Sequence, residues 1–346
     1  MAAAVISGLV SQWLSAPREL PPAQFWALHA FSTLALALAL MMVSATVETL
    51  THRTLKWLEQ RGVIERLSPQ IPETQHSFQA QTALTFLTSS WFVLLIVMHP
   101  AVLSRLLALA KPRFDVLEIA YSCYVGVVAH DLWFFLIHSQ LHRIKWLYRW
   151  IHITHHRNMG DLNVFGTADM DPFEAVAMVF SFYAATLLWG AYVVGSWNPW
   201  AYTALILLEA NMNMMGHCGY RQPLWLAMIQ SWGICLTPGV AHAKTHYIHH
   251  LDPRMNRALY FSWWDRLAGS WRDKHPAIRE FTPAEQLEYE LRAFRMLAGV
   301  MAKWLPPKYT SSTPVAALLK AAKRLAQPAQ SLLLLASVAS CHAAPA

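Results

Sequence analysis

The chain has 346 residues, of which 55% are hydrophobic and 14% are charged, and its mean hydropathy is positive. These proportions are too apolar for an ordinary soluble domain of this length and predict a membrane protein. The net charge of +7 comes from Lys and Arg residues dispersed beside hydrophobic stretches. This dispersal excludes a basic nucleic-acid-binding stripe and favours contact with an anionic membrane surface.

Four stretches are apolar and long enough to cross about 30 Å of hydrocarbon as helices. They are 25–47, 83–104, 116–137 and 175–195. A fifth stretch, 199–216, is shorter and contains Glu209. The fold class that follows is all-α, a multi-pass membrane bundle of about four to five transmembrane helices. We expect the first span to be retained, because no basic flank of a cleaved signal peptide precedes it.

Lys and Arg residues near the span ends concentrate in segments 51–80, 138–172 and 217–305, which we therefore place in the cytosol. The basic turn near Lys111 conflicts with this topology, because it falls on the outer side. The four cysteines have no CxxC spacing, which argues against a disulfide framework and favours a reducing compartment.

We divide the chain into an N-terminal transmembrane region (1–114), a catalytic domain (115–272) and a C-terminal amphipathic tail (273–346). In the tail, Thr282 and Glu285 have the spacing of a helix capping box, followed by an amphipathic stretch to about Leu305. The apolar segment 331–340 is too short to span a membrane.

Histidines carry the strongest functional signal. The chain has 17 of them, and eight form three compact boxes. The boxes are His138-x3-His142, His152-x2-His155-His156 and His246-x2-His249-His250. On a helix, residues four apart share a face, so each box can direct imidazoles at one point. Imidazole is a common ligand of transition metals, and this many exceed the needs of one four-coordinate ion. The boxes therefore predict two metal ions in a histidine-rich cap on the cytosolic face.

Polar residues between the boxes supply further candidates. Glu209, Asn213 and His217 are four residues apart in a mainly apolar segment, so we expect this strip to line the site, with His217 as a ligand and the other two as supporting residues. Asp131 lies two turns before His138 and is predicted to accept the second N–H of a ligating imidazole. His242 and His130 are additional candidate ligands, His130 with a structural role as the favoured alternative.

These motifs resemble the fatty acid hydroxylase and sterol desaturase superfamily of membrane di-iron enzymes. The resemblance covers roughly 115–272 and rests on the ordered boxes, on His217-Cys218-Gly219-Tyr220, and on the closing stretch from Trp264 to Ser270. It implies two iron ions, molecular oxygen, electrons from cytochrome b5 or a similar carrier, and the endoplasmic reticulum membrane. It also implies a lipid substrate that is hydroxylated or desaturated.

Within the superfamily, the tetrapeptide at His217 and the spacing from Asn256 to Trp264 look most like sphingolipid C4-hydroxylases, with sterol C5-desaturases and C4-methylsterol oxidases close behind. The sequence departs from the family pattern at Asp171-Pro172-Phe173-Glu174, where the family has His-Pro-x-Glu, and at Arg257, where an aromatic residue is usual. Sphingoid and sterol substrates both stay open. Aromatic residues near the boxes are candidates to line the substrate path, namely Trp133, Phe134, Phe135, Tyr260, Phe261 and Trp263.

Three other functions compete with this interpretation. A haem-binding electron carrier uses single axial histidines within spans, which the His-His pairs at span ends do not match. A membrane zinc hydrolase would be expected to carry HExxH or a GxSxG elbow, and neither motif occurs. A catalytically silent regulator that keeps the fold is the third alternative.

Overall fold

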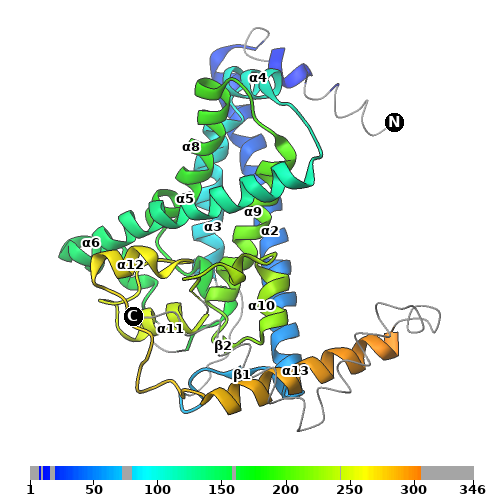
Figure 1. The fold of residues 1–346 in the computed structure, drawn as a ribbon. Helices are drawn as coiled ribbons and strands as arrows, with labels where there is room; N and C mark the ends of the chain where they lie inside the picture. Colours follow the sequence, from blue (N-terminus) through cyan, green and yellow to red (C-terminus); the bar gives the residue numbers. More distant parts are fainter. Residues whose placement is uncertain are drawn as a thin grey trace.

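The computed structural model describes residues 8, 11–15, 20–71, 80–157, 161–241 and 243–304. Within them the protein is mainly helical (Figure 1), which confirms the predicted all-α class. The helices are α2 (Pro22–Gln60), α3 (Ala80–Val97), α4 (Pro100–Leu109), α5 (Val116–Arg143), α6 (Lys145–Trp150), α7 (Pro172–Ala175), α8 (Ser181–Trp189), α9 (Pro199–Gly216), α10 (Leu224–Gln230), α11 (Ala243–Leu251), α12 (Ser262–Ala268) and α13 (Pro283–Trp304).

Short turns and one small sheet complete the described fold. The 3-10 turns are His152–Thr154, Val164–Ala168 and Ile234–Leu236, and the π-helical turns are Val176–Phe180 and Gly190–Val194. Strand β1 (Glu65–Arg66) pairs antiparallel with β2 (Tyr220–Arg221), a pairing that the sequence did not predict. The sheet ties the segment after α2 to the segment after α9.

Three helical stretches are long and apolar enough to cross a membrane: Pro22–Gln60, Val116–Arg143 and Pro172–Val194. A fourth span results if Thr82–Val97 and Pro100–Leu109 count together, although they meet at a bend of 73°. Large apolar side chains on the first of these face outward, such as Phe31 at 71% and Met42 at 66% exposure. Exposed apolar surface of this extent is expected where a protein faces lipid.

Two predicted spans differ from the structure in detail. The stretch 83–104, predicted as continuous, breaks after Val97, because His99 caps a new helix that begins at Pro100 and a proline has no N–H to continue the preceding helix. The fifth stretch, 199–216, forms helix α9, but α9 is not among the candidate spans. Its polar residues, Glu209 among them, explain why.

Helix α9 packs closely against α5 in the middle of the molecule. Val127 and Phe134 of α5 lie in one core cluster with Leu205, Leu208 and Met212 of α9. Both helices begin at strong caps: Asp115 accepts the amides of Leu117 and Glu118, and Asn198 accepts the amide of Trp200. This packing brings the C-terminal ends of α5 and α9, which carry histidines, to neighbouring positions.

A second core lies beyond the apolar spans. Helix α2 has 39 residues, which at 1.5 Å per residue makes it about 58 Å long, so its C-terminal part extends past the hydrocarbon. There Leu55 and Leu58 pack in a cluster with Tyr247 and Ile248 of α11 and with Ala293 of α13.

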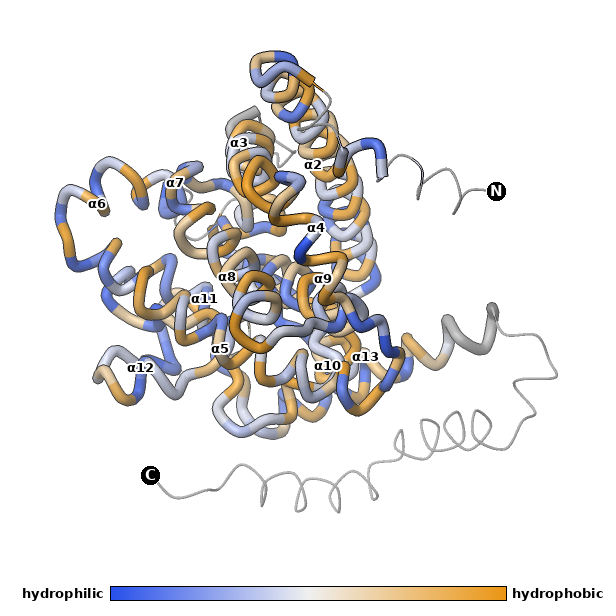
Figure 2. Tube along the Cα trace, turned by 90° about the horizontal axis from the view of Figure 1, so that it is seen from above, coloured by the Kyte–Doolittle hydropathy of each residue, from blue (hydrophilic) through white to orange (hydrophobic). Residues whose placement is uncertain are grey.

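In Figure 2, hydrophobic residues dominate α4 and α8, whereas hydrophilic residues are frequent around α6 and α12.

The start of α13 confirms the predicted capping box. The Glu285 amide donates to the Thr282 hydroxyl, and the Thr282 amide donates to the Glu285 carboxylate. The described cysteines, Cys123, Cys218 and Cys235, are free thiols. The apolar segment 331–340 lies outside the described residues.

Candidate metal centre

The structure brings all nine predicted ligands into two adjacent groups. The five-histidine group consists of His138, His142, His152, His156 and His249, and the four-histidine group of His155, His217, His246 and His250. Within each group the candidate ligand atoms all lie within 4.8 Å of one another. All nine side chains are buried except that of His142, which is partly exposed.

Three different parts of the chain build the five-histidine group. The Nε2 atom of His152 lies 3.0 Å from that of His138 and 2.9 Å from that of His142. The Nε2 atom of His156 lies 3.0 Å from that of His152 and 3.2 Å from that of His249. The second box therefore stands between the end of α5 and helix α11. Its backbone is a 3-10 turn followed by turns rather than the predicted helix, yet its imidazoles still converge.

The four-histidine group links the same turn to α9 and α11. The Nε2 atom of His246 lies 2.8 Å from that of His217 and 3.1 Å from that of His250. The Nε2 atom of His155 lies 3.4 Å from that of His217. His217 caps the C-terminal end of α9, where the sequence predicted it.

Adjacent histidines of one box serve different groups. His155 belongs to the four-histidine group and His156 to the five-histidine group, and His249 and His250 divide in the same way. Successive residues on a helical turn point in directions about 100° apart, so a His-His pair between two sites contributes one ligand to each. This division explains why two of the three boxes end in a pair, a point that spacing alone did not reveal.

Backbone carbonyls fix the tautomers of several of these imidazoles. The Nδ1 atoms of His155 and His217 lie 3.3 Å and 3.0 Å from the carbonyls of Asp169 and Asn213. A carbonyl oxygen only accepts, so each Nδ1 must carry the proton and each Nε2 must present a lone pair. Two lone pairs facing each other at 3.4 Å repel unless a cation lies between them. The donor set therefore fits a metal ion.

The spacing of the nitrogens also fits a metal ion. Metal–imidazole bonds are about 2.1 Å long, which puts neighbouring ligand nitrogens of one ion about 3.0–3.4 Å apart. The Nε2 separations in both groups, from 2.8 to 3.4 Å, lie close to this range. Five and four imidazoles respectively suit a transition metal rather than Mg²⁺ or Ca²⁺, which prefer oxygen ligands.

Burial keeps these histidines in the neutral form that a metal requires. Loss of solvation lowers the pKa of His217 and of His249 to about 4. The pKa values of His155, His246 and His250 also fall well below the ordinary imidazole value, first through burial and then through repulsion from neighbouring imidazoles. At neutral pH the ligand lone pairs are therefore free.

Two of the supporting residues have other partners than predicted. The prediction that Asp131 accepts from a ligating imidazole is wrong, because its carboxylate accepts the amides of Leu259, Tyr260 and Phe261. Glu209 does not line either histidine group; it forms an ion pair with His130 at 2.7 Å and accepts the Tyr183 hydroxyl at 2.5 Å. Both side chains are buried, so each group depends on the other as its charged partner.

The remaining candidates from the sequence are His130, Asn213 and His242. His130 is not in either group, and its Nε2 lies 3.1 Å from the Met178 carbonyl, which supports the structural role that the sequence favoured. Asn213 contributes through its backbone carbonyl, which accepts from His217, rather than through its side chain. His242 lies outside the described residues.

One residue that supports the site was not predicted. Glu174 is fully buried, and its carboxylate lies 2.8 Å from Nδ1 of His152. A carboxylate behind a ligating imidazole fixes the tautomer and raises the basicity of the ligand. The available signal was Asp171-Pro172-Phe173-Glu174, in which Glu174 matches the Glu of the family motif His-Pro-x-Glu and Asp171 replaces its His. The carbonyls that orient other histidines leave no sequence signal.

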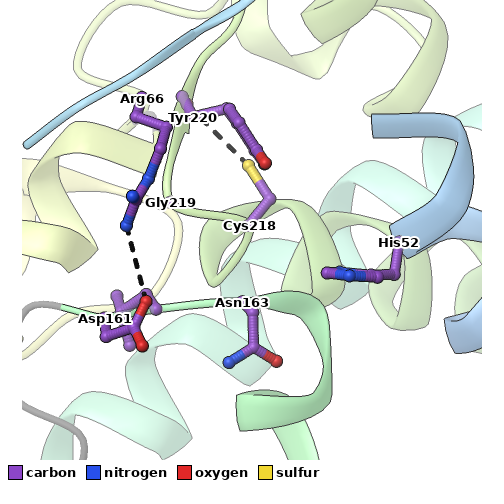
Figure 3. A pocket seen from close by; sticks show the side chains of 8 residues that line it. His52, Arg66, Asp161, Asn163, Cys218, Gly219 and Tyr220 are labelled. Carbon is purple, nitrogen blue, oxygen red and sulfur yellow. Dashed lines mark hydrogen bonds and ion pairs between the residues drawn. The ribbon is translucent and has the colours of Figure 1, made fainter. Parts of the chain in front are cut away.

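A polar pocket lies beside the four-histidine group (Figure 3). Cys218, Gly219 and Tyr220, which directly follow the ligand candidate His217, form one wall, and His52 lies across from them. Arg66 and Asp161 form an ion pair at 3.5 Å in its wall. Gly219 has φ +74°, and a Cβ there would overlap the Leu162 carbonyl, so the tetrapeptide requires glycine at this position. The pocket suits water rather than a lipid chain.

Fold and site together define a class of protein: a helical membrane protein with two adjacent sites of buried, neutral imidazoles on one side of its spans. Within that class, residues 123–270 match the model of the fatty acid hydroxylase family, which confirms the predicted resemblance over the central part of the chain. The match ends at Ser270, in the motif where the resemblance was also seen to close.

Comparison with curated proteins agrees with this family match. The chain is 26% identical over 157 residues to cholesterol 25-hydroxylase-like protein 1, member 2, of Danio rerio, covering 45% of this chain and 52% of the relative. It is 29% identical over 159 residues to methylsterol monooxygenase 1 of Gallus gallus, covering 46% and 48% respectively. It is 28% identical over 158 residues to human cholesterol 25-hydroxylase, covering 46% and 54%. The chain thus spans about half the length of the curated relatives it matches. No solved structure is significantly similar to it.

Proposed function

We propose that the protein is a membrane-bound non-haem di-iron oxygenase that hydroxylates or desaturates a lipid, with molecular oxygen as co-substrate. The observation that carries the proposal is the convergence of nine neutral imidazoles into two neighbouring groups beside apolar helices. When bound, two iron ions supply the reductive activation of oxygen that attack on an unactivated C–H bond requires.

The chain's own residues would hold and orient the ions and keep the site dry. The five-histidine group would bind one ion and the four-histidine group the other. Glu174 and the backbone carbonyls behind the imidazoles fix the ligand directions. Burial of the groups excludes water, which protects reactive oxygen chemistry from side reactions.

A sterol is the substrate class that we favour. The names of the relatives, cholesterol 25-hydroxylase and methylsterol monooxygenase, refer to sterol oxidation, whereas the motif similarity to sphingolipid hydroxylases keeps a sphingoid base as the second candidate. A second pocket is lined mainly by apolar residues, among them Met212 and Met215 of α9, Ala227 of α10 and Tyr260. Its lining residue Ala243 stands one turn before His246, so a lipid held there would approach the four-histidine group.

The cellular setting is part of the proposal. We place the protein in the endoplasmic reticulum membrane, with the histidine groups facing the cytosol and a cytochrome b5-type carrier as electron donor. The basic residues next to the boxes, among them Lys145 and Arg149 on α6, support the cytosolic side. Both the donor and the organelle rest on the resemblance.

The test compares lipids from cells that express the wild-type chain, the His155→Ala variant and a His275→Ala control, grown under ¹⁸O₂. His275 is a histidine outside both groups. We expect a lipid with one added ¹⁸O atom, or one that has lost two hydrogens, in wild-type and control cells and not with His155→Ala. An equal lipid profile in all three would contradict the oxygenase and favour a silent regulator. A Soret absorption band from the purified protein would favour the haem carrier instead.

A further inference from the structure

We infer that the segment from Met255 to Phe261, here called the orienting loop, positions two ligands of the five-histidine group, and that Asp131, Asn256 and Asp265 are the positioning residues that set its shape. The inference rests on the proposed binding of metal by that group. The loop begins shortly after the end of α11 at Leu251 and contacts α5 at Asp131 and His138.

Two carbonyls of the loop face two imidazoles of the same group. The carbonyl of Met255 lies 2.7 Å from Nδ1 of His249, and the carbonyl of Arg257 lies 2.7 Å from Nδ1 of His138. Each carbonyl fixes the proton on Nδ1 and turns Nε2 toward the centre of the group. The ligands come from α5 and α11, which are separated in the chain by residues 144–242, so the loop sets their relative orientation.

Asn256 stands between these two carbonyls and locks the backbone there. It is fully buried and has φ +52°, a left-handed conformation that asparagine tolerates better than most residues. Its side-chain amide donates to the carbonyls of Thr245 and Arg272, at 3.2 and 2.7 Å, and its oxygen accepts the Arg272 amide at 2.7 Å. Rotation of this one residue would move both orienting carbonyls.

Two buried carboxylates hold the rest of the loop. Asp265 accepts the amides of Arg257 and Ala258, both at 2.8 Å, and the Ser270 hydroxyl at 2.6 Å. Asp131 accepts three consecutive loop amides, those of Leu259, Tyr260 and Phe261, at 2.7–2.9 Å. Hydrogen bonds from amides to an ionised carboxylate are stronger than those between neutral groups, so this attachment is rigid.

Asp131 connects the orienting loop to the same helix that carries the ligand His138. Asp131 and His138 lie on the same face of α5, two turns apart, and the loop that Asp131 holds returns the Arg257 carbonyl to His138. In the four-histidine group, the carbonyls that orient His155 and His217 belong to Asp169 and Asn213, which lie outside the orienting loop. Disturbing the loop should therefore affect one metal site and spare the other.

The test measures metal binding to the purified full-length chain, with cobalt(II) as a probe whose visible absorption reports ligand geometry. The variants are Asp131→Asn and Asn256→Gly, and the latter keeps the left-handed backbone accessible if the first fails to fold. Asp115→Asn is the matched control, since Asp115 also accepts backbone amides on α5 but at its far end. We expect two cobalt ions per chain in wild type and control. In both loop variants, we expect one site to bind about 10–100-fold more weakly with an altered spectrum.

The outcomes separate the two proposals. Equal affinity for both ions in wild type and variants, or equal loss of both ions in the variants, would overturn the role of the loop and leave the metal sites standing. Wild-type protein that binds no cobalt and no iron would overturn the proposed function and the loop's role with it.

Discussion

The two histidine groups share a turn and a helix, yet their surroundings differ. The five-histidine group has a carboxylate behind His152 and orienting carbonyls behind His138 and His249. The four-histidine group has only carbonyls, behind His155 and His217, and lies beside a polar pocket. A negatively charged partner raises imidazole basicity more than a neutral one does. We therefore expect the five-histidine group to hold its metal more tightly.

We expect the largest effect from substituting either of two adjacent histidines, His155 and His156, which belong to different groups. His155→Ala should remove the metal of the four-histidine group, and His156→Ala that of the five-histidine group. Each should lower lipid oxidation by more than about 100-fold, because even the outer partners of metal ligands are worth roughly 10–100-fold. Elemental analysis of the purified variants, beside product assays, checks this. Loss of the same metal in both variants would remove the distinction between the groups.

The buried ion pair of His130 and Glu209 lies outside both histidine groups, so we expect its loss to lower stability without removing a metal ion. Glu209→Leu should leave His130 without its ion-pair partner, and breaking a buried pair costs about 3–5 kcal/mol. We expect a lower thermal unfolding midpoint in detergent, with both metals retained by the folded fraction. A variant that unfolds at the wild-type temperature but has lost a metal would assign Glu209 to the metal centre instead.

A smaller effect should follow from weakening the support of one ligand. Glu174→Gln keeps the size of the side chain but removes the charge behind His152. Metal affinity of the five-histidine group should fall about 10–100-fold, while the four-histidine group is unchanged. Competition with a chelator, followed by metal analysis, measures both. A uniform fall at both sites would show that the two groups are not independent.

A further effect is shared by the two groups and depends on pH. In the metal-free folded protein the pKa of His217 and of His249 is lowered to about 4, whereas an unfolded imidazole titrates at about 6.5. Between these values the unfolded chain binds more protons, so stability falls as the pH drops from about 6.5 toward about 4. The thermal midpoint of the metal-free protein should fall with it. A midpoint that stays constant over this range would contradict the neutral, buried state.

The ligands could be predicted from the sequence because their spacing is local. His138 and His142 are four residues apart on a helix, and such a pair converges wherever the helix lies. The division of the His-His pairs between two groups could not be predicted, because it depends on how α5, α9 and α11 meet.

The supporting residues were harder to predict. The sequence predicted a ligating imidazole as the partner of Asp131, but its partners come from a loop more than 120 residues away in the sequence. The carbonyls of Met255 and Arg257 belong to the backbone, so no residue type marks them. The break in the second predicted span had a local signal, His99-Pro100, which the hydropathy of the surrounding residues concealed.

The central claim is that two metal ions, each in its own histidine group, form one centre. The most direct measurement is the metal content per chain of the purified wild-type protein, combined with Mössbauer spectroscopy of ⁵⁷Fe-enriched samples. The account predicts two iron ions per chain with two distinct quadrupole signals, one for the site with five imidazoles and one for the site with four. A single ion per chain, such as one zinc, would contradict it.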